Sequence, residues 1–214
     1  MAKSKLYWAG GLFSLLQLQG NHSLSRFVNE IADDRYDLRL PQDLDFSGVA
    51  GPKDIRDLDF RALLTSQIAV FSFDGSELDS GTLVEFIIAK VADIPAVVIR
   101  SDFRSAGDNA EAPWNLMAHG YPRTETVLLH AMVEYGAALK ATGDPGQAID
   151  CVLRNYAGRI VEALRKVEAS APLAAKPDLA HLGEWLPKCL DLSQDIQGDM
   201  RKAFSQRTDR PGLE

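Results

Sequence analysis

Short apolar segments alternate, over the first half of the chain, with longer segments whose apolar residues recur at helical spacing. Apolar runs predict buried strands at 6–9, 36–40, 68–73 and 96–99. Helical patterns lie between them at 24–33, 52–66 and 82–92. This β-α-β-α-β-α-β order predicts a parallel sheet with helices on its faces, because parallel strands need a crossover connection.

Two of these helices have a marked apolar side. The helix that begins with Pro52 in its first turn is predicted to bury Ile55, Leu58 and Leu63. The helix at 82–92 is predicted to point four residues inward, namely Leu83, Phe86, Ile87 and Val91. Polar segments at 42–51, 74–81 and 101–113 predict loops.

The second half of the chain is helical in pattern throughout. One helix is predicted from Val127, Leu128, Ala131, Met132 and Tyr135, and a second from Ile149, Val152, Tyr156, Ile160, Leu164 and Val167. Pro172 and Pro177 indicate a linker, a third helix is expected at 190–204, and the end at 207–214 is expected to fray. At about 150 residues per domain, the 214 residues indicate one domain with an extension.

The charge balance argues against a nucleic-acid binder. The chain has 23 Lys and Arg against 30 Asp and Glu, a net charge of −7, whereas phosphate contacts need clustered cations. A neutral nucleoside stays possible as a ligand. The two cysteines, Cys151 and Cys189, show neither zinc spacing nor a disulfide framework, so we expect a reducing, cytoplasmic compartment.

The N-terminal segment superficially resembles a signal peptide, because Lys3 and Lys5 precede an apolar stretch. Gly10 and Gly11 interrupt that stretch, and no small-x-small cleavage pattern follows, so a buried first strand that ends in a glycine turn is expected instead. No apolar run approaches the roughly 20 residues of a membrane span, and no membrane partner is expected.

Three polar features fall where predicted strands end, which is where open parallel sheets bind ligands. They are the glycine turn in YWAGGLF (7–13), the segment DSGTLVE (79–85) and the segment PWNLM (113–117). Each has a structural alternative, because the glycines can simply make a tight turn, and Asp79 or Asn115 can cap a helix. Glu85 in a first helical turn can simply complement the helix dipole. Two carboxylates at this spacing can also divide nucleophile and acid roles.

Other chemistries have little support in the sequence. His22, His119, His130 and His181 show no metal-ligand spacing, so core or surface histidines are expected and no metal or cofactor is predicted. Ser14 lacks the G-x-S-x-G frame of a serine hydrolase.

Together, in this order and spacing, the three segments resemble the nucleoside 2-deoxyribosyltransferase family over residues 4–135. The resemblance implies a flavodoxin-like, Rossmann-like three-layer sandwich at 1–140. It leaves a helical extension at 141–214, packed on the same domain or on a neighbouring subunit. It implies transfer of 2-deoxyribose between nucleobases with retention, through a covalent deoxyribosyl-glutamate. The partners it implies are a 2′-deoxyribonucleoside, a free nucleobase and further copies of the chain in a dimer-based homo-oligomer, often a hexamer.

The resemblance also implies roles for single residues. Glu85 matches the nucleophile, Tyr7 the tyrosine that orients it, and Asp79 an aspartate beside the base and sugar. Asp59 matches the aspartate that handles the proton of the base, with Asp57 and Asp54 as alternatives nearby.

Substrate contacts carry over in the same way. Asn115 matches an asparagine that reaches into the pocket of the neighbouring subunit and contacts the 5′-hydroxyl of the sugar bound there. The other substrate-binding positions implied are Gly10, Gly11, Phe13, Gln42 and Met117.

The chain departs from the family pattern in two respects. Phe86 stands where the family commonly has a glycine after the nucleophile, and the helices after about Pro145 have no counterpart.

Two other functions stay open. One is an N-glycosidic hydrolase of deoxynucleosides or their 5′-monophosphates, although the glycine turn offers only Ser14 and no Arg for a phosphate. The other is a non-enzymatic binding protein, against which the retained carboxylates argue.

Overall fold

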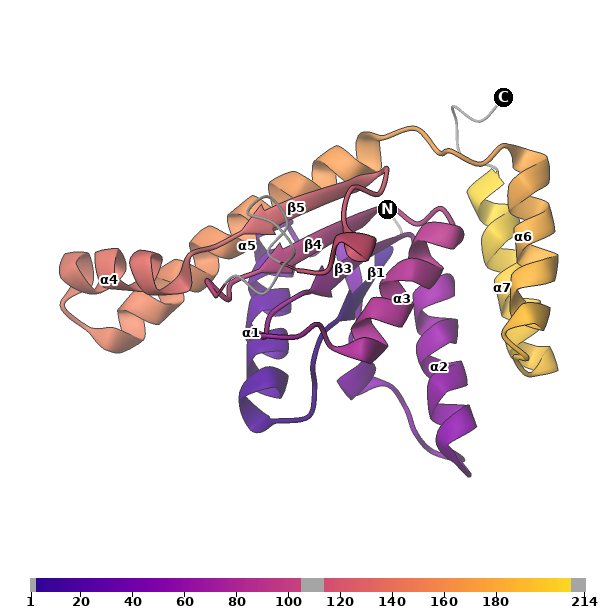
Figure 1. Ribbon diagram of the computed structural model, residues 1–214, viewed down its shortest axis with the longest axis horizontal. Coiled ribbons are helices and arrows are strands. Elements are labelled where there is room, and N and C mark those ends of the chain that lie inside the picture. The colour runs from indigo at the N-terminus through magenta and orange to yellow at the C-terminus, as the bar shows by residue number, and fades with distance from the viewer. Residues whose placement is uncertain (1–2, 105–113, 209–214) are drawn as a thin grey trace.

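A computed structural model describes residues 3–104 and 114–208 of the chain. A five-stranded, entirely parallel sheet forms its centre, with the strand order β2-β1-β3-β4-β5 (Figure 1). The strands are β1 (Ser4–Ala9), β2 (Tyr36–Arg39), β3 (Ile68–Ser72), β4 (Ala96–Arg100) and β5 (Thr124–Leu128). This is the doubly wound, flavodoxin-like order, and the predicted fold class is confirmed.

The strand order creates a switch point at the carboxyl ends of β1 and β3. The chain leaves β1 toward β2 on one side and continues to β3 on the other, so the loops after β1 and β3 diverge. Ligands of doubly wound sheets bind at this switch point, outside the carboxyl ends of the strands. The loops that follow Ala9 and Ser72 therefore border the expected site.

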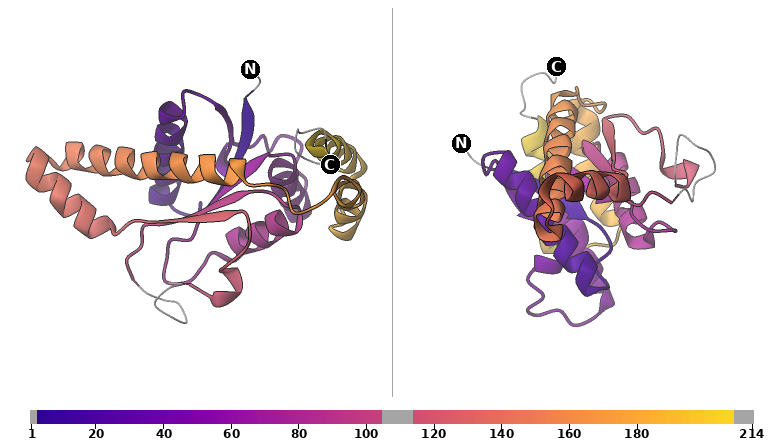
Figure 2. Two further views of the ribbon diagram at one scale, coloured as in Figure 1. Left: turned by 90° about the horizontal axis from the view of Figure 1, so that it is seen from above. Right: turned by 90° about the vertical axis from the view of Figure 1, so that its left-hand side faces the viewer.

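Alternate residues of β1 face opposite layers of the molecule. Tyr7 and Ala9 pack in the core beneath α2 (Pro52–Leu64) and α3 (Ser80–Val91), whereas Leu6 and Trp8 pack beneath α1 (Leu15–Ile31) and α5 (Pro145–Ala169). Figure 2, seen from above, shows α5 and α3 on opposite sides of the strands. The central strands are apolar on both faces because helices cover both.

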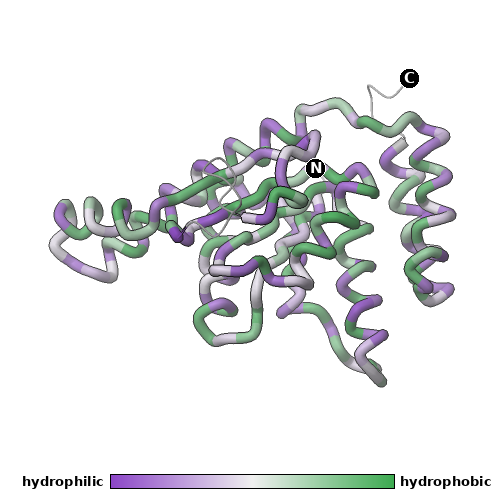
Figure 3. The backbone as a smooth tube through the Cα atoms, in the orientation of Figure 1, coloured by the Kyte–Doolittle hydropathy of each residue, from purple (hydrophilic) through white to green (hydrophobic). Residues whose placement is uncertain are grey.

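A pair of C-terminal helices packs outside the α2–α3 layer. These are α6 (Lys176–Cys189) and α7 (Gln194–Thr208), which lie side by side (Figure 1). Leu186, Met200 and Phe204 belong to the same core cluster as Phe60 and Leu63 of α2. Hydrophobic and hydrophilic positions alternate around both helices in Figure 3, as expected for helices with one buried side.

The fifth strand corrects the sequence prediction. Residues 124–128 pair with β4, where Val127 lies opposite Ile99, so Val127 and Leu128 do not begin a helix. A short apolar run fits the spacing of a helix as well as that of a strand. Here the segment forms a strand because it pairs with the edge of β4. The helix α4 (Ala131–Thr142) follows, and it has no buried residue.

The C-terminal prediction was also wrong in detail. The helix expected at 190–204 is present as α7, but a further helix, α6, precedes it, and Pro177 lies in the first turn of α6 rather than in a linker. Arg207 is buried rather than frayed, because its guanidinium donates hydrogen bonds to the carbonyl oxygens of Leu64, Ser66 and Ala92. The rest of the segment expected to fray, 209–214, lies outside the described residues.

Two predicted core residues lie at the surface. Ile55 is 43% exposed and Val91 is 45% exposed, whereas Leu63 and Phe86 are buried as predicted. The buried stripe of α2 is rotated toward Asp57, which is 4% exposed and is neutralised by ion pairs. The predicted loop at 42–51 begins inside a 3-10 helix, η1 (Pro41–Asp43), and most of the predicted loop at 101–113 lies outside the described residues.

The position of α5 bears on how the sheet is covered. This 25-residue helix packs along α1 and under β4 and β5, and its N-terminal part projects from the body with α4 (Figure 1). A division of the chain near residue 140 stays a prediction. None of the helices in the described part of the chain is long and apolar enough to cross a membrane.

Candidate active site

A buried tyrosine and a glutamate meet at the centre of the α2–α3 side. Tyr7 projects from the middle of β1 and is fully buried, and Glu85 lies in the second turn of α3. The Tyr7 hydroxyl donates a hydrogen bond of 2.7 Å to Glu85 Oε1. Burial raises the pKa of Tyr7 well above its usual value, and the charges of Glu85 and Asp59 act in the same direction. Tyr7 is therefore a fixed donor that holds the carboxylate in one orientation.

The environment of Glu85 favours its neutral form. Burial raises the pKa of the Glu85 carboxyl to about 7, and the negative charges of Asp59 and Asp79 add to the rise. The hydrogen bond from Tyr7 opposes it and lowers the pKa. A carboxyl group that titrates near neutrality in a partly closed site has the properties expected of an enzymatic acid, base or nucleophile.

Asp59 is the second carboxyl group of this cluster, and it comes from α2. Burial raises the pKa of Asp59 to about 6. Its Oδ1 atom is buried and has no hydrogen-bond partner among the residues that the structure describes. An unpaired buried oxygen costs about 1–3 kcal/mol, so it is a feature that a ligand can satisfy.

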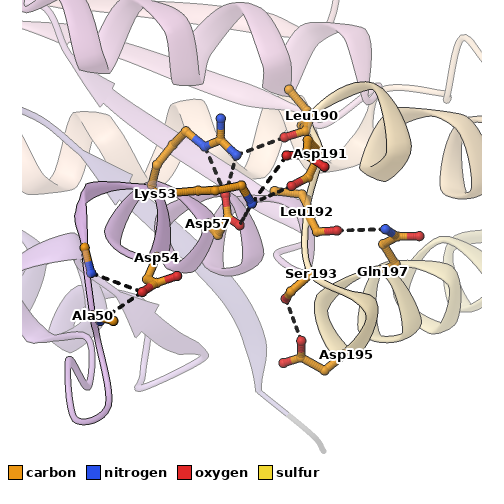
Figure 4. A network of polar contacts seen from close by, with 12 residues as sticks. Ala50, Lys53, Asp54, Asp57, Leu190, Asp191, Leu192, Ser193, Asp195 and Gln197 are labelled. Atoms are coloured by element: carbon orange, nitrogen blue, oxygen red, sulfur yellow. Dashed lines mark hydrogen bonds and ion pairs between the residues drawn. The ribbon is translucent and has the colours of Figure 1, made fainter.

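The two alternative aspartates on α2 have structural partners instead. Asp54 accepts hydrogen bonds from the backbone N–H groups of Ala50 and Gly51 at the start of α2. Asp57 binds Lys53 and Arg56, which also donate to carbonyl oxygens in the α6–α7 turn (Figure 4). Both carboxylates are thus engaged in holding the fold, and Asp59 is the α2 carboxylate that acts on Glu85.

Asp79 has the capping role that the sequence left open. Its Oδ2 accepts hydrogen bonds of 2.8 Å from both the backbone N–H and the hydroxyl of Thr82 at the start of α3. Its charge nevertheless raises the pKa of Glu85, so it lies close to the cluster. The cap therefore fixes the position of the Asp79 carboxylate at the start of α3.

A cavity of about 640 Å³ opens at the carboxyl ends of the strands. Trp8, Asn21, Ser72 and Tyr156 contribute to its lining, on the α1–α5 side of the sheet. Of the four predicted catalytic residues, Asp79 lines it, whereas Tyr7, Asp59 and Glu85 lie on the other side of β1 and β3. The volume suits a small ligand such as a nucleoside.

The glycine turn after β1 is packed closely against this cavity. A Cβ atom at Gly10 would lie 3.0 Å from Ser72 Cβ, so only glycine fits without movement. Gly11 accepts a hydrogen bond of 3.0 Å from the Asn21 side chain. Asn21 also lies 3.4 Å from Gln42 Oε1, and the Gln42 amide donates to Leu18 O at 3.1 Å. Asn21 thus joins the turn to the loop after β2.

The remaining predicted contacts lie at the surface of the chain. Phe13 is 80% exposed and Met117 is 77% exposed. Asn115 is also exposed, and its side chain caps the 3-10 helix η2 (Leu116–Ala118) by accepting from Met117 N–H at 2.9 Å. Pro113, the first residue of that segment, lies outside the described residues. Within one chain, these residues are not brought to Glu85 by any described contact.

Two residues that the sequence patterns did not reveal hold the rim of the cavity. The buried Arg100 donates hydrogen bonds to the carbonyl oxygens of Phe73, Gly75 and Arg104, which joins the β3–α3 loop to the end of β4. Asp74 accepts from the backbone and hydroxyl of Ser101. A charged residue that directly follows or ends a buried strand was the available signal in both cases.

The structure gives a physical account of the departure at Phe86. Its ring is 1% exposed and makes edge contacts with Phe71, Phe73 and Tyr121 at 5.3–5.4 Å between centroids. Phe86 therefore fills the core beneath α3 and leaves Glu85 on the adjacent face of the helix. An aromatic side chain at this position is compatible with the site.

Histidines and acidic residues are also possible metal ligands. The part of the chain that the structure describes contains no group of three His, Cys, Asp or Glu residues that could hold a metal ion. The four histidines are exposed, which agrees with the surface alternative, and His130 stacks on Phe103.

Comparisons with known proteins place the chain only at the level of its fold. It matches no known protein-family profile and no curated protein. A conserved protein from Enterococcus faecalis is similar, with 29% sequence identity and a TM-score of 0.51 over 62% of this chain and 95% of that one. A 2-deoxyribosyltransferase from Bacillus psychrosaccharolyticus shares 15% identity, with a TM-score of 0.42 over 54% of this chain and 80% of that one. The first match leaves more than a third of this chain uncovered.

Proposed function

We propose that this protein is a nucleoside deoxyribosyltransferase, which moves 2-deoxyribose from one nucleobase to another through an ester on Glu85. The observation that carries the proposal is the hydrogen bond of 2.7 Å between the fully buried Tyr7 and Glu85, with Asp59 and Asp79 close by. The sequence resemblance assigns the chemistry to these same four residues. Two neighbouring carboxyl groups, one that acts as nucleophile in its ionised form and one that acts as the acid, are what a retaining glycosyl transfer requires.

The proposed first step forms one bond and breaks one. The Glu85 carboxylate attacks the anomeric carbon of the nucleoside, and the bond from that carbon to the base nitrogen breaks. The transition state is cationic, and the anionic carboxylate first stabilises and then traps it. Asp59 donates a proton to a ring nitrogen of the leaving base, for which a raised pKa of about 6 suits it better than an ordinary aspartate.

The second step is the reverse with a new base. The incoming base attacks the deoxyribosyl ester, returns its proton to Asp59 and releases the Glu85 carboxylate. Two inversions at the same carbon give retention of configuration. Water that enters instead gives hydrolysis, so the closed environment of Glu85 favours transfer.

The deciding experiment incubates the protein with a deoxynucleoside and a second free base. Formation of the exchanged nucleoside is expected from the wild type, and none from Glu85→Ala, whose fold is checked by circular dichroism. A fluorinated deoxynucleoside should leave an adduct on the peptide that contains Glu85, detected by mass spectrometry. An adduct elsewhere overturns the assignment, and free deoxyribose without any exchanged product favours the hydrolase.

The sugar preference tests the same transition state. We expect deoxyadenosine to react much faster than adenosine, and deoxyuridine much faster than uridine. A 2′-hydroxyl withdraws electrons from the cationic carbon and needs space beside Glu85. Equal rates for the two sugars would indicate a general nucleosidase instead.

Asn115 extends the proposal to the oligomer. It is exposed on its own chain, so we propose that it serves the site of a neighbouring subunit in a homo-oligomer. Such contacts across a two-fold axis are reciprocal. Co-expressed Glu85→Ala and Asn115→Ala chains should therefore recover activity that each lacks alone, because one mixed site contains both intact residues. Verified heteromers that stay inactive would refute this arrangement.

A further inference from the structure

The C-terminal helix α7 forms one wall of a second cavity, separate from the one at the strand ends. It has a volume of about 660 Å³ and lies between α2, α7 and the β1–β2 edge of the sheet. Lys202 contributes from α7, Arg61 from α2, Lys5 from β1 and Arg39 from the end of β2. Glu85 does not line it, so this cavity is distinct from the proposed catalytic cluster.

The lining of this cavity has the opposite charge to the rest of the chain. Its four cationic side chains face two carboxylates, Asp45 and Asp199, which leaves an excess of two positive charges in a protein of net charge −7. Asp199 is ion-paired with Arg61, and Asp45 accepts a hydrogen bond from Ser47 N–H. Both carboxylates are therefore satisfied within the lining.

The other cations retain donors for a ligand. Lys5 and Lys202 form no ion pair with any residue in the described ranges. Arg39 pairs with Asp37 through one terminal nitrogen, whereas its Nε is buried and lacks a hydrogen-bond partner in the part of the chain that the structure describes. A buried guanidinium N–H without an acceptor is unfavourable, and an anionic oxygen satisfies it.

We propose that this cavity binds a phosphorylated small molecule, with the phosphate held by Lys5, Arg39 and Lys202. Arginine and lysine together favour phosphate, because the guanidinium presents a planar set of donors and the ammonium groups supply point charge. Leu44, Leu58 and Ala62 add apolar surface for the uncharged part of the ligand. A concave site of this size suits a nucleotide-sized molecule rather than a nucleic-acid strand or a membrane.

The phosphate site is connected through the chain to the proposed catalytic cluster, although the proposal of a phosphate site does not depend on the proposed activity. Leu58 lines the cavity and directly precedes Asp59, and the loop residues Leu44 to Ser47 follow the 3-10 helix that contains Gln42. A ligand in the cavity therefore contacts both segments. Since α7 supplies one wall, the C-terminal extension acquires a function, namely the completion of an anion site.

The test measures phosphate binding directly. Thermal unfolding of the full chain is followed against increasing inorganic phosphate, pyrophosphate or adenosine 5′-monophosphate, with sodium chloride at equal ionic strength as the reference. We expect a saturable rise in Tm that exceeds the effect of chloride, and tighter binding of the larger probes. The absence of a saturable rise with all three probes overturns the proposal, and this outcome leaves the proposed activity untouched.

Matched variants locate the binding. Lys202→Gln and Arg39→Gln should each weaken phosphate binding at least about ten-fold, since each removes one charge-assisted contact. Lys140→Gln, an exposed lysine on α4, should bind as the wild type does. Because Lys202 is exposed, its replacement leaves the fold intact, which circular dichroism checks. Equal affinity in Lys202→Gln and Lys140→Gln overturns the location.

Discussion

The raised pKa of Glu85 predicts that this side chain weakens the fold at neutral pH. The buried carboxyl group has a pKa of about 7 in the folded chain, against an ordinary value of 4.5. The folded state thus holds a proton that the unfolded state has already lost. The stability that this proton confers is fully present below pH 4.5 and is lost as the pH rises through 7. Replacement by the neutral, isosteric glutamine in Glu85→Gln removes this dependence.

The size of the effect follows from the two pKa values. At about 1.4 kcal/mol per pKa unit, the whole loss is about 3 kcal/mol, and about 2.5 kcal/mol of it falls between pH 5 and pH 8. We therefore expect Glu85→Gln to gain about 2.5 kcal/mol in unfolding free energy relative to the wild type over that interval. Above about pH 7.5 the difference should become constant.

Urea unfolding, followed by circular dichroism at half-unit steps from pH 5 to pH 8, measures this difference. Glu162→Gln is the matched control, because Glu162 is exposed on α5, and its difference from the wild type should not change with pH. A constant difference between Glu85→Gln and the wild type would show that Glu85 titrates as an ordinary glutamate. That result would show that burial and the charges of Asp59 and Asp79 do not raise the pKa of Glu85.

Four further variants test the same structure. Tyr7→Phe removes the hydrogen bond that lowers the pKa of Glu85, so the rise of exchange rate with pH should move to higher pH; an unmoved profile contradicts the pairing. Gly183→Ala should destabilise the fold by about 1–3 kcal/mol, because its Cβ would lie 2.9 Å from the Cβ of buried Phe204. Gly198→Ala, with open space, should instead stabilise it by about 0.5–1 kcal/mol in urea unfolding. Arg100→Lys cannot reach all three carbonyl oxygens and should cost about 2–4 kcal/mol, measured in the same way.

The sequence determined the central sheet because its signals there are local and agree with one another. The runs at 6–9, 68–73 and 96–99 are apolar at nearly every position, and each is followed by a turn signal and a helical pattern or loop. Four of the five strands and the helices between them follow from that pattern alone. Helix caps such as Asp79 are equally local, since the cap and its donor are three residues apart.

Where a local pattern fits more than one secondary structure or more than one buried face, the tertiary structure decided the outcome. Residues 124–128 became a strand because β4 offered a free edge, and Ile55 came to the surface because Asp57 found cationic partners. Arg207 was expected to fray, yet three carbonyl oxygens from distant segments bury it. The β4 residues that pair with 124–128 and the carbonyl oxygens that Arg207 binds are distant in sequence, so no local pattern carries the information.

The candidate site divides in the same way. The spacing of Asp79 and Glu85 at the start of one helix indicates a carboxylate pair from local sequence alone. The contact of Glu85 with Tyr7 joins residues 78 positions apart, and it exists because α3 packs on the face of the sheet from which Tyr7 projects. The basic cavity could not be predicted from any local pattern, because Lys5, Arg39 and Lys202 come from the two ends of the chain. Burial and charge at a site depend on which distant segments pack together, and that is decided by the fold as a whole.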